Sequence, residues 1–233
     1  MLSNVRRVTM LPLLLIVATG PALGDDWRNC ERISFAPLDF DIPACTRLID
    51  LGALSDDQMI TALLARAKAY LFARTYRSDH NVDPKQLTMS ASADLDRAIA
   101  IIRNGDSKLF GRLRLALSQR ASVLLQLEKP EQAAHDFAEV LRTFGGQIVP
   151  ILHGHALAMK RLGRFKEAIA DMDALIRIAT DTPNYHNWIF TRGEIFEAAA
   201  DRSAAIEDFR RTLKFDPKHV AAARALKRLG VDP

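Results

Sequence analysis

Aromatic residues are scarce in this chain of 233 residues, of which they make up 7%. There is also no long run in which β-branched residues alternate with polar ones, the pattern typical of a half-buried β-strand. Apolar residues make up 48% and charged residues 26%, and the helix-favouring residues alanine and leucine are plentiful. The composition therefore predicts a folded, all-α protein.

The motifs of several enzyme classes are absent from the sequence. There is no glycine-rich phosphate loop, no G-x-S-x-G nucleophile elbow and no H-E-x-x-H zinc motif. The pair His153-x-His155 cannot share one ion on a helix, because residues two apart point about 200° away from each other. Asp171-x-Asp173 is interpreted as a pair of solvated helix residues. We therefore assign no catalytic residue, no metal site and no cofactor, and we predict that the protein is not an enzyme.

A run rich in lysine and arginine is missing as well. The formal net charge is +4, and residues 1–24 contribute two arginines and no acid, so the remainder has 30 basic and 28 acidic residues and a net charge of +2. So small an excess does not indicate binding to a polyanion. We therefore expect no nucleic-acid partner.

The first 24 residues differ from the rest of the chain. Arg6 and Arg7 precede the apolar segment "LPLLLIVATG", and Ala22 and Gly24 form a small-x-small end. This order predicts a secretory signal peptide that is cleaved after Gly24, and hence a periplasmic or secreted protein. The alternative is an N-terminal membrane anchor, but the apolar run over 8–23 is short for a spanning helix and is interrupted by prolines and glycine. No stable anchor is expected after cleavage.

Only two cysteines are present, Cys30 and Cys45, and both follow the predicted cleavage site. An even number of cysteines in an oxidising compartment usually means a disulfide. Their spacing does not fit the C-x-x-C pattern of redox and zinc sites. We therefore predict a Cys30–Cys45 disulfide.

A repeat of 35 to 37 residues runs through the second half of the chain. A small residue is followed twelve positions later by alanine in three places, at Ala121 and Ala133, Ala156 and Ala168, and Gly193 and Ala205. Bulkier side chains lie four and seven residues after each second alanine. This spacing predicts pairs of antiparallel helices that approach most closely at the small residues and bury the bulkier ones beneath. Such a pair needs neighbours on both sides to bury its apolar face.

A fainter copy of the repeat lies upstream, at Ala67 and Ala91, where the gap is 24 residues. The additional residues fall in the polar stretch "RSDHNVDPKQLT" over 77–88, which we interpret as a loop inserted between two helices. Helix starts are predicted by a Ser55–Gln58 capping box and by three N-cap residues that precede proline. These three are Asp83, Thr182 and Asp216, and the glycines expected to end helices are Gly105, Gly145, Gly146, Gly163 and Gly230.

The arrangement resembles the tetratricopeptide repeat, in which W-x2-L-G-x2-Y, A-x3-F and a proline recur about every 34 residues. The matching stretches are "IFTRGEIF" at 189–196, "AIEDF" at 205–209 and Pro217, together with "HALAMKRLGRFKEAIADM" at 155–172. Trp188 lies one residue before the family's tryptophan position, and Ala121 and Ala156 stand where the family usually has glycine. The resemblance implies an all-α, TPR-like helical-repeat solenoid built from antiparallel helix pairs.

The predicted organisation has three parts. Residues 1–24 form the signal peptide, 25–54 a degenerate N-terminal helix pair in which Cys45 takes a bulky position, and 55–233 the repeat array. The repeats are placed at about 60–104, 114–147, 149–182 and 186–219, and a capping helix at 217–229 closes the array.

The resemblance implies a protein–protein interaction scaffold that binds a peptide or partner protein on its concave face. In the family, the first helix of each pair lines that face, and the family's clamp for a C-terminal carboxylate is missing here. The corresponding residues of this chain are Lys68, Ser118, Ser122, His153, Lys160, Arg161, Phe190, Glu194 and Glu197. Two alternatives stay open: an envelope-assembly subunit that self-associates through its end repeats, and a non-catalytic subunit of an envelope enzyme. The sequence does not identify the partner, the pathway or the oligomeric state.

Overall fold

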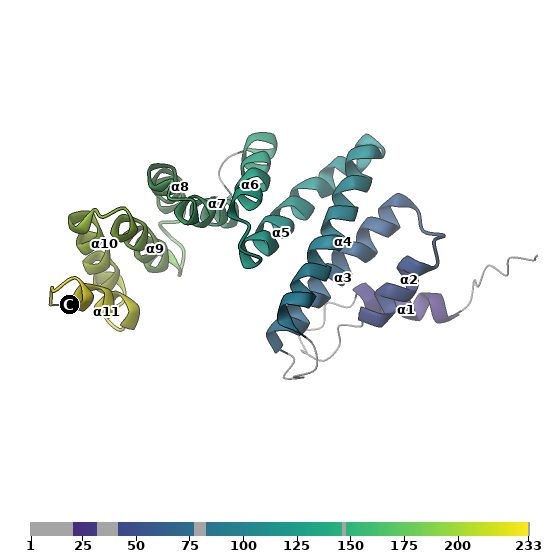
Figure 1. Ribbon diagram of the computed structural model, residues 1–233, viewed down its shortest axis with the longest axis horizontal. Helices are drawn as coiled ribbons and strands as arrows, with labels where there is room; N and C mark the ends of the chain where they lie inside the picture. The colour runs from purple at the N-terminus through teal and green to yellow at the C-terminus, as the bar shows by residue number, and fades with distance from the viewer. Residues whose placement is uncertain (1–20, 32–41, 77–82, 146–147, 233) are drawn as a thin grey trace, which may run out of the picture.

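The computed structural model describes residues 21–31, 42–76, 83–145 and 148–232, and within these ranges all regular structure is helical (Figure 1). The helices are α1 (Pro21–Glu31), α2 (Ile42–Asp50), α3 (Asp56–Tyr76), α4 (Pro84–Asn104), α5 (Leu113–Gln126), α6 (Pro130–Phe144), α7 (Val149–Arg161), α8 (Phe165–Ile178), α9 (Tyr185–Ala198), α10 (Arg202–Phe215) and α11 (Val220–Arg228), with a 3-10 helix at Ser107–Arg112. The all-α prediction is confirmed.

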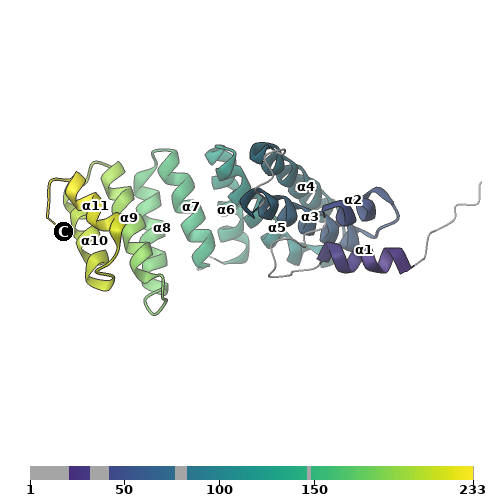
Figure 2. The same cartoon turned by 90° about the horizontal axis from the view of Figure 1, so that it is seen from below.

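The helices stack in chain order into an elongated array (Figure 2). Each helix packs mainly on the helix before it and the helix after it, and the most extensive contacts join α3 to α4, α5 to α6, α7 to α8 and α9 to α10. The pair α1–α2 and helix α11 lie at opposite ends of the array. This is the quasi-one-dimensional packing of a repeat solenoid, and the predicted architecture is confirmed.

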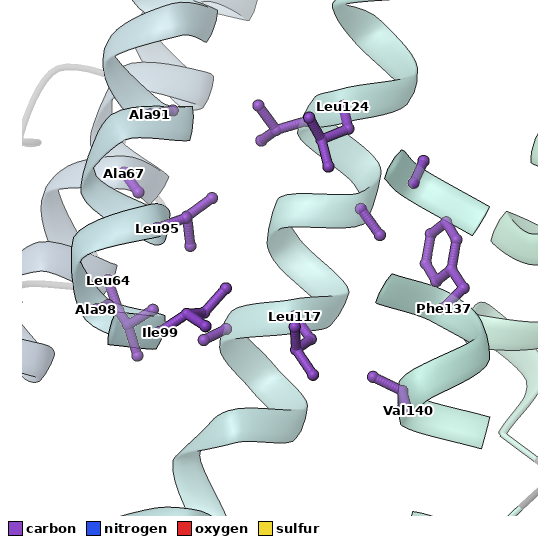
Figure 3. Packing of buried hydrophobic residues seen from close by; sticks show 14 of the residues in the cluster. Leu64, Ala67, Ala91, Leu95, Ala98, Ile99, Leu117, Leu124, Phe137 and Val140 are labelled. Carbon is purple, nitrogen blue, oxygen red and sulfur yellow. The ribbon is translucent and has the colours of Figure 1, made fainter. Parts of the chain in front are cut away.

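The small residues of the repeat lie where paired helices meet. Ala67, Ala91, Ala121 and Ala133 are at most 1% exposed, and the equivalent residues of the next repeats are also buried. The bulkier side chains that follow them fill the interior, as Leu95, Phe137 and Val140 do in Figure 3, although the first repeat has the small Ala98 at its second such position. The corresponding later residues are Met172, Leu175, Phe209 and Thr212. The predicted division between small and bulky positions is confirmed.

The close approach of neighbouring helices also explains why glycine occurs at two positions within helices. A Cβ atom on Gly154 would lie 2.3 Å from Cζ of Phe137, and one on Gly193 would lie 2.8 Å from Cε1 of Phe209. Both phenylalanines are buried, so their rings occupy the space that a side chain on these glycines would need.

The insertion near residue 80 was wrongly predicted to be a loop as far as Thr88. Helices α3 and α4 are 21 residues long, whereas the later repeat helices have 13 to 15 residues. Helix α4 begins at Pro84, seven residues before Ala91, whereas α6 begins three residues before Ala133. Much of the insertion therefore lengthens both helices by about one turn, and residues 77–82 lie outside the described part of the chain.

Helix starts are confirmed where a side chain reaches the first turn. Ser55 and Gln58 form the capping box, with backbone N–H donors 3.0 and 3.3 Å from the opposite side-chain oxygens. Asp83 Oδ1 accepts from the backbone N–H of Lys85 at 2.9 Å. The other two predicted N-caps are wrong, since α9 and α11 begin three to four residues later. Thr182 donates back to the carbonyl of Ala179, and Asp216 accepts from the N–H of Lys218 within a turn.

Helices α1 and α2 are joined by the Cys30–Cys45 disulfide, and both cysteines are buried. The described part of α1 begins at Pro21, so the predicted cleavage site after Gly24 falls within its first turn. The apolar segment of the predicted signal peptide lies outside the described residues. Among the helices described, none is both long and apolar enough to cross a membrane.

Candidate protein-binding face

The nine residues predicted to line a groove lie on the odd-numbered helices α3, α5, α7 and α9. Three of them are exposed, and six are half-buried. The exposed ones are Lys68, Ser122 and Arg161; the half-buried ones are Ser118, His153, Lys160, Phe190, Glu194 and Glu197.

The charged residues of this set are used largely in bonds between neighbouring odd-numbered helices. Lys160 Nζ on α7 lies 3.7 Å from Glu194 Oε2 on α9. Glu197 on α9 accepts two hydrogen bonds from Arg228 on α11, at 2.8 and 2.6 Å. The hydrogen bonds from Arg228 lower the pKa of the Glu197 carboxyl, which keeps it ionised. We call the surface formed by Lys160, Glu194, Glu197 and Arg228 the charged ladder.

The remaining polar residues on α5 and α7 bond to the backbone. Arg161 donates to the carbonyl of Leu125 near the end of α5, so it ties the two helices together. Ser118 and Ser122 donate to the carbonyls one turn earlier in their own helix, at 2.6 and 3.0 Å. Substitution of Arg161 is therefore expected to affect folding as well as binding, and Lys160 is the cleaner test of the surface.

Aromatic and imidazole rings also lie on helices α7, α9 and, at its N-cap, α11. The ring centroids of His153 on α7 and Trp188 on α9 lie 4.9 Å apart. Burial lowers the pKa of this histidine. The ring centroid of Phe190 lies 4.8 Å from that of His219 and 5.5 Å from that of Phe209. The indole N–H of Trp188 is buried and has no hydrogen-bond partner among the described residues. Helices α7, α9 and α11 thus carry ring pairs as well as alternating charge, and Trp188 and Phe190 point to opposite sides of α9.

The structure reveals a set of buried polar pairs that the sequence analysis did not anticipate. In each repeat, an arginine or histidine on the first helix bonds to an aspartate on the second. Arg120 donates to both carboxylate oxygens of Asp136 at 2.7 Å, and the same arrangement joins Arg66 to Asp94 and Arg192 to Asp208. In the third repeat, His155 Nδ1 lies 2.6 Å from Asp171 Oδ2.

Two of these arginines also reach the preceding repeat. Arg120 Nη1 donates to Asp96 on α4 at 2.8 Å, and Arg192 Nη1 donates to Asp173 on α8 at 2.7 Å. The hydrogen bonds to the buried aspartates are the main cause of the raised pKa values of both guanidinium groups. Each arginine therefore joins three helices, two in its own repeat and one in the repeat before it.

This pattern corrects the interpretation of Asp171 as a solvated residue, since its side chain is only 17% exposed, whereas Asp173 is exposed as predicted but ion-paired. The first aspartate pairs with His155 of its own repeat, and the second pairs with Arg192 of the next. The signal was present in the sequence: the cation directly precedes the small residue of the first helix, and the aspartate follows the second-helix alanine by three positions. The second repeat has Ala138 at the position where Asp96 and Asp173 lie in the repeats on either side. The repeat that follows it correspondingly carries the less basic His155 in place of arginine.

One group of side chains has the donor types of a metal site but the wrong electrostatics. His135, Asp136 and Glu139 on α6 have ligand atoms within 4.8 Å of one another. Both carboxylates are already taken by arginines, however, because Asp136 bonds to Arg120 and Glu139 accepts from Arg103 at 2.7 and 2.9 Å. A cation at this position would face two guanidinium groups, so we assign no metal to it.

The antiparallel pairs, the buried small positions and the stacking in chain order define a solenoid with the tetratricopeptide-repeat fold. Known structures share it. The chain is similar to YrrB, described as a TPR protein with an unusual peptide-binding site, with a TM-score of 0.60, 15% identity and coverage of 80% of this chain and 81% of that one. It is also similar to MamA from Desulfovibrio magneticus RS-1, with a TM-score of 0.63, 12% identity and coverage of 87% and 99%.

The same fold occurs in a tetratricopeptide repeat protein from Parabacteroides merdae, with a TM-score of 0.50, 14% identity and coverage of 90% and 73%. No family model matches the sequence, and no curated protein matches it. At these identities the likeness establishes the fold, and the side chains on the candidate face must be judged from their own chemistry.

Proposed function

We propose that this protein is a non-enzymatic scaffold that binds an extended peptide segment of a partner protein across helices α5, α7 and α9. The observation that carries the proposal is the charged ladder, in which side chains of both charge signs alternate across α7, α9 and α11. His153 lies on the same face of α7 as Lys160, and Phe190 on the same face of α9 as Glu194, by their helical spacing. Ring surface gives apolar contact area, and fixed charges select the orientation of a peptide. Neighbours of this fold include a protein described as having a peptide-binding site.

We also propose that the protein acts outside the cytoplasm after removal of residues 1–24. The basic start, apolar segment and small-x-small end of these residues support export. The Cys30–Cys45 disulfide supports it independently, because such bonds persist mainly in oxidising compartments.

The binding proposal is tested by reversing one ion pair without breaking it. The double variant Lys160→Glu with Glu194→Lys keeps opposite charges on α7 and α9 but inverts the charge pattern of the face. A phage-displayed library of random peptides is selected on the unaltered protein, and the selected peptides are then measured against the variant. We expect their affinity to fall about tenfold or more, while the melting temperature changes little.

A matched control reverses an ion pair between even-numbered helices. Arg103→Glu with Glu139→Arg inverts the pair between α4 and α6, which carry none of the nine predicted groove residues. The selected peptides should bind this control as tightly as the unaltered protein. Equal binding to both variants would place the peptide site elsewhere, and failure to select any peptide would contradict the proposed function.

A further inference from the structure

The charges of this chain are segregated toward its two ends. Residues 25–54 contain six acidic and three basic residues, a net charge of −3. Residues 217–233 contain four basic residues and one acidic residue, a net charge of +3. The long central part, 55–216, has 23 basic and 21 acidic residues and is close to neutral for its length. Figure 2 shows α1 and α2, the described helices of the first segment, and α11, the helix of the last, at opposite ends of the array.

Helix α11 presents a binding surface at the basic end. Its inner side is formed by Ala222, Ala225 and Leu226, which are buried against α10. The opposite side carries Val220, Ala223, Arg224 and Lys227, whose spacing of three and four residues places them on one face. With Pro217, Lys218 and His219, they line a hollow of about 500 Å³.

The hollow has an apolar floor and a basic rim. Val220 is 61% exposed, and Ala223 follows it by three residues on the same face. Lys218, Arg224 and Lys227 are all exposed around them. A surface of this kind suits an acidic partner with an apolar side chain at its centre.

Helices α1 and α2 at the opposite end carry four acidic and two basic residues, and each basic residue is ion-paired with one of the acids, so the excess charge there is negative. Glu31 ends α1 and Asp50 ends α2, and both side chains are exposed. The next residue, Leu51, is 47% exposed. The acidic end therefore has an exposed apolar side chain directly after an exposed carboxylate in the chain, and the basic end has exposed Val220 in a hollow lined by cations.

We propose that copies of this chain associate head to tail, with the α1–α2 end of one copy seated on the outer face of α11 of the next. Such a contact joins two different surfaces, so it leaves one of each open and adds further copies instead of stopping at a dimer. The arrangement continues the stack of helices across the molecular boundary. It leaves the candidate peptide-binding face on α5, α7 and α9 available, and it does not depend on the function proposed for that face.

The proposal is tested by measuring mass against protein concentration with light scattering and sedimentation. In about 0.05 M salt the average mass should rise continuously beyond that of a dimer, and in about 0.5 M salt it should fall toward the monomer because the charges are screened. The protein is used with its disulfide intact. A mass that stays at the monomer at every concentration in low salt would overturn the proposal, as would one that saturates at the dimer.

Charge reversal at each end identifies the surfaces. The tail variant carries Lys218→Glu and Arg224→Glu, and the head variant carries Glu31→Lys and Asp50→Lys. Each variant alone should remain monomeric at concentrations roughly ten times higher than the unaltered protein, because like charges then face each other. Circular dichroism and thermal melting are recorded first, so that loss of association is distinguished from loss of folding.

Mixing the two variants gives a result that misfolding cannot imitate. The unaltered tail of the head variant can bind the unaltered head of the tail variant, and the two reversed ends are again opposite in charge. An equimolar mixture should therefore regain association that neither variant shows alone. If the mixture stays monomeric, or if either variant associates like the unaltered protein, the ends are not the contact surfaces.

Discussion

The arginine–aspartate pairs are the polar contacts that join the two helices of a repeat, and Arg120 and Arg192 also reach the repeat before their own. Arg192 is 18% exposed and Asp208 is 4% exposed, whereas Asp173, the partner in the preceding repeat, is 52% exposed. The two carboxylates thus meet the same guanidinium in different surroundings. Loss of the arginine leaves one charge buried and the other in water.

This difference predicts unequal effects of substitution. Arg192→Ala should lower the free energy of unfolding by about 3–5 kcal/mol, because Asp208 is left buried without its partner. Asp173→Asn should cost no more than about 1 kcal/mol, since its pair is exposed. Urea unfolding followed by circular dichroism measures both.

The double variant Arg192→Met with Asp208→Leu serves as the control. It removes the buried charge along with its partner and should recover most of the stability lost in Arg192→Ala. Equal losses for Arg192→Ala and Asp173→Asn would show that burial of Asp208 does not control the effect.

For single residues, the sequence predicted the apolar side chains of the interior but not the buried polar ones. Ala133, Phe137 and Val140 were found because helical periodicity reports burial of apolar residues. Asp136 was not found, because charged residues are taken as exposed by default. Its regular place three residues after the repeat's alanine becomes visible only after the repeats are aligned on the alanines.

At the scale of the element, helix starts depend on whether a side chain can reach the first free backbone N–H groups. Ser55 and Asp83 do so and were predicted correctly. Thr182 and Asp216 were predicted wrongly because their prolines lie in turns that precede the helices. The cap of α11 is instead His219, whose Nδ1 accepts from the N–H of Ala222 at 3.1 Å. Histidine is not among the usual N-cap residues, so residue type alone does not predict this cap.

The cap of α10 makes a prediction about pH. Asp201 Oδ1 accepts from the N–H of Ala204 at 3.1 Å, and this backbone hydrogen bond, followed by one from the Ser203 hydroxyl, lowers the pKa of the carboxyl from its ordinary value of 3.8. Because the pKa is lower in the folded protein, the stabilisation is present above that ordinary value and is lost as the pH falls through the folded-state pKa. Asp201→Asn retains a capping oxygen but does not titrate.

Melting temperatures of the two proteins from about pH 5 to about pH 2 test this expectation. The unaltered protein should lose stability faster than Asp201→Asn as the pH falls, so the difference between them should shrink or change sign. Asp26 and Glu197 also have lowered pKa values, through Arg47 and Arg228, and both are present in each protein. Parallel curves would show that the Asp201 cap contributes nothing that depends on its charge.

At the scale of the whole molecule, the buried apolar residues form two separate clusters. The larger runs from Cys30 to Ile195, and the smaller joins α10 to α11 through Ala205, Phe209, Ala222, Ala225 and Leu226. The stack of pairs and its order were predictable, since each repeat carries its own periodicity. The division of the buried residues into two clusters was not predictable from the sequence, because it depends on which side chains meet across α9. In a solenoid, a local cluster can open without the rest.

Hydrogen exchange should therefore show that the C-terminal end opens first. Leu226 and Leu117 are both fully buried, so truncation of either to alanine removes a similar side chain, at a cost of about 2–5 kcal/mol. Leu226→Ala should raise amide exchange in α10 and α11 and leave α3 to α8 protected, because the smaller cluster has no buried member in those helices. Leu117→Ala should raise exchange across α4 to α7, whose buried residues belong to the larger cluster around it. If Leu226→Ala instead raised exchange equally along the whole array, the molecule would unfold as one cooperative unit and the two clusters would be energetically coupled through α9.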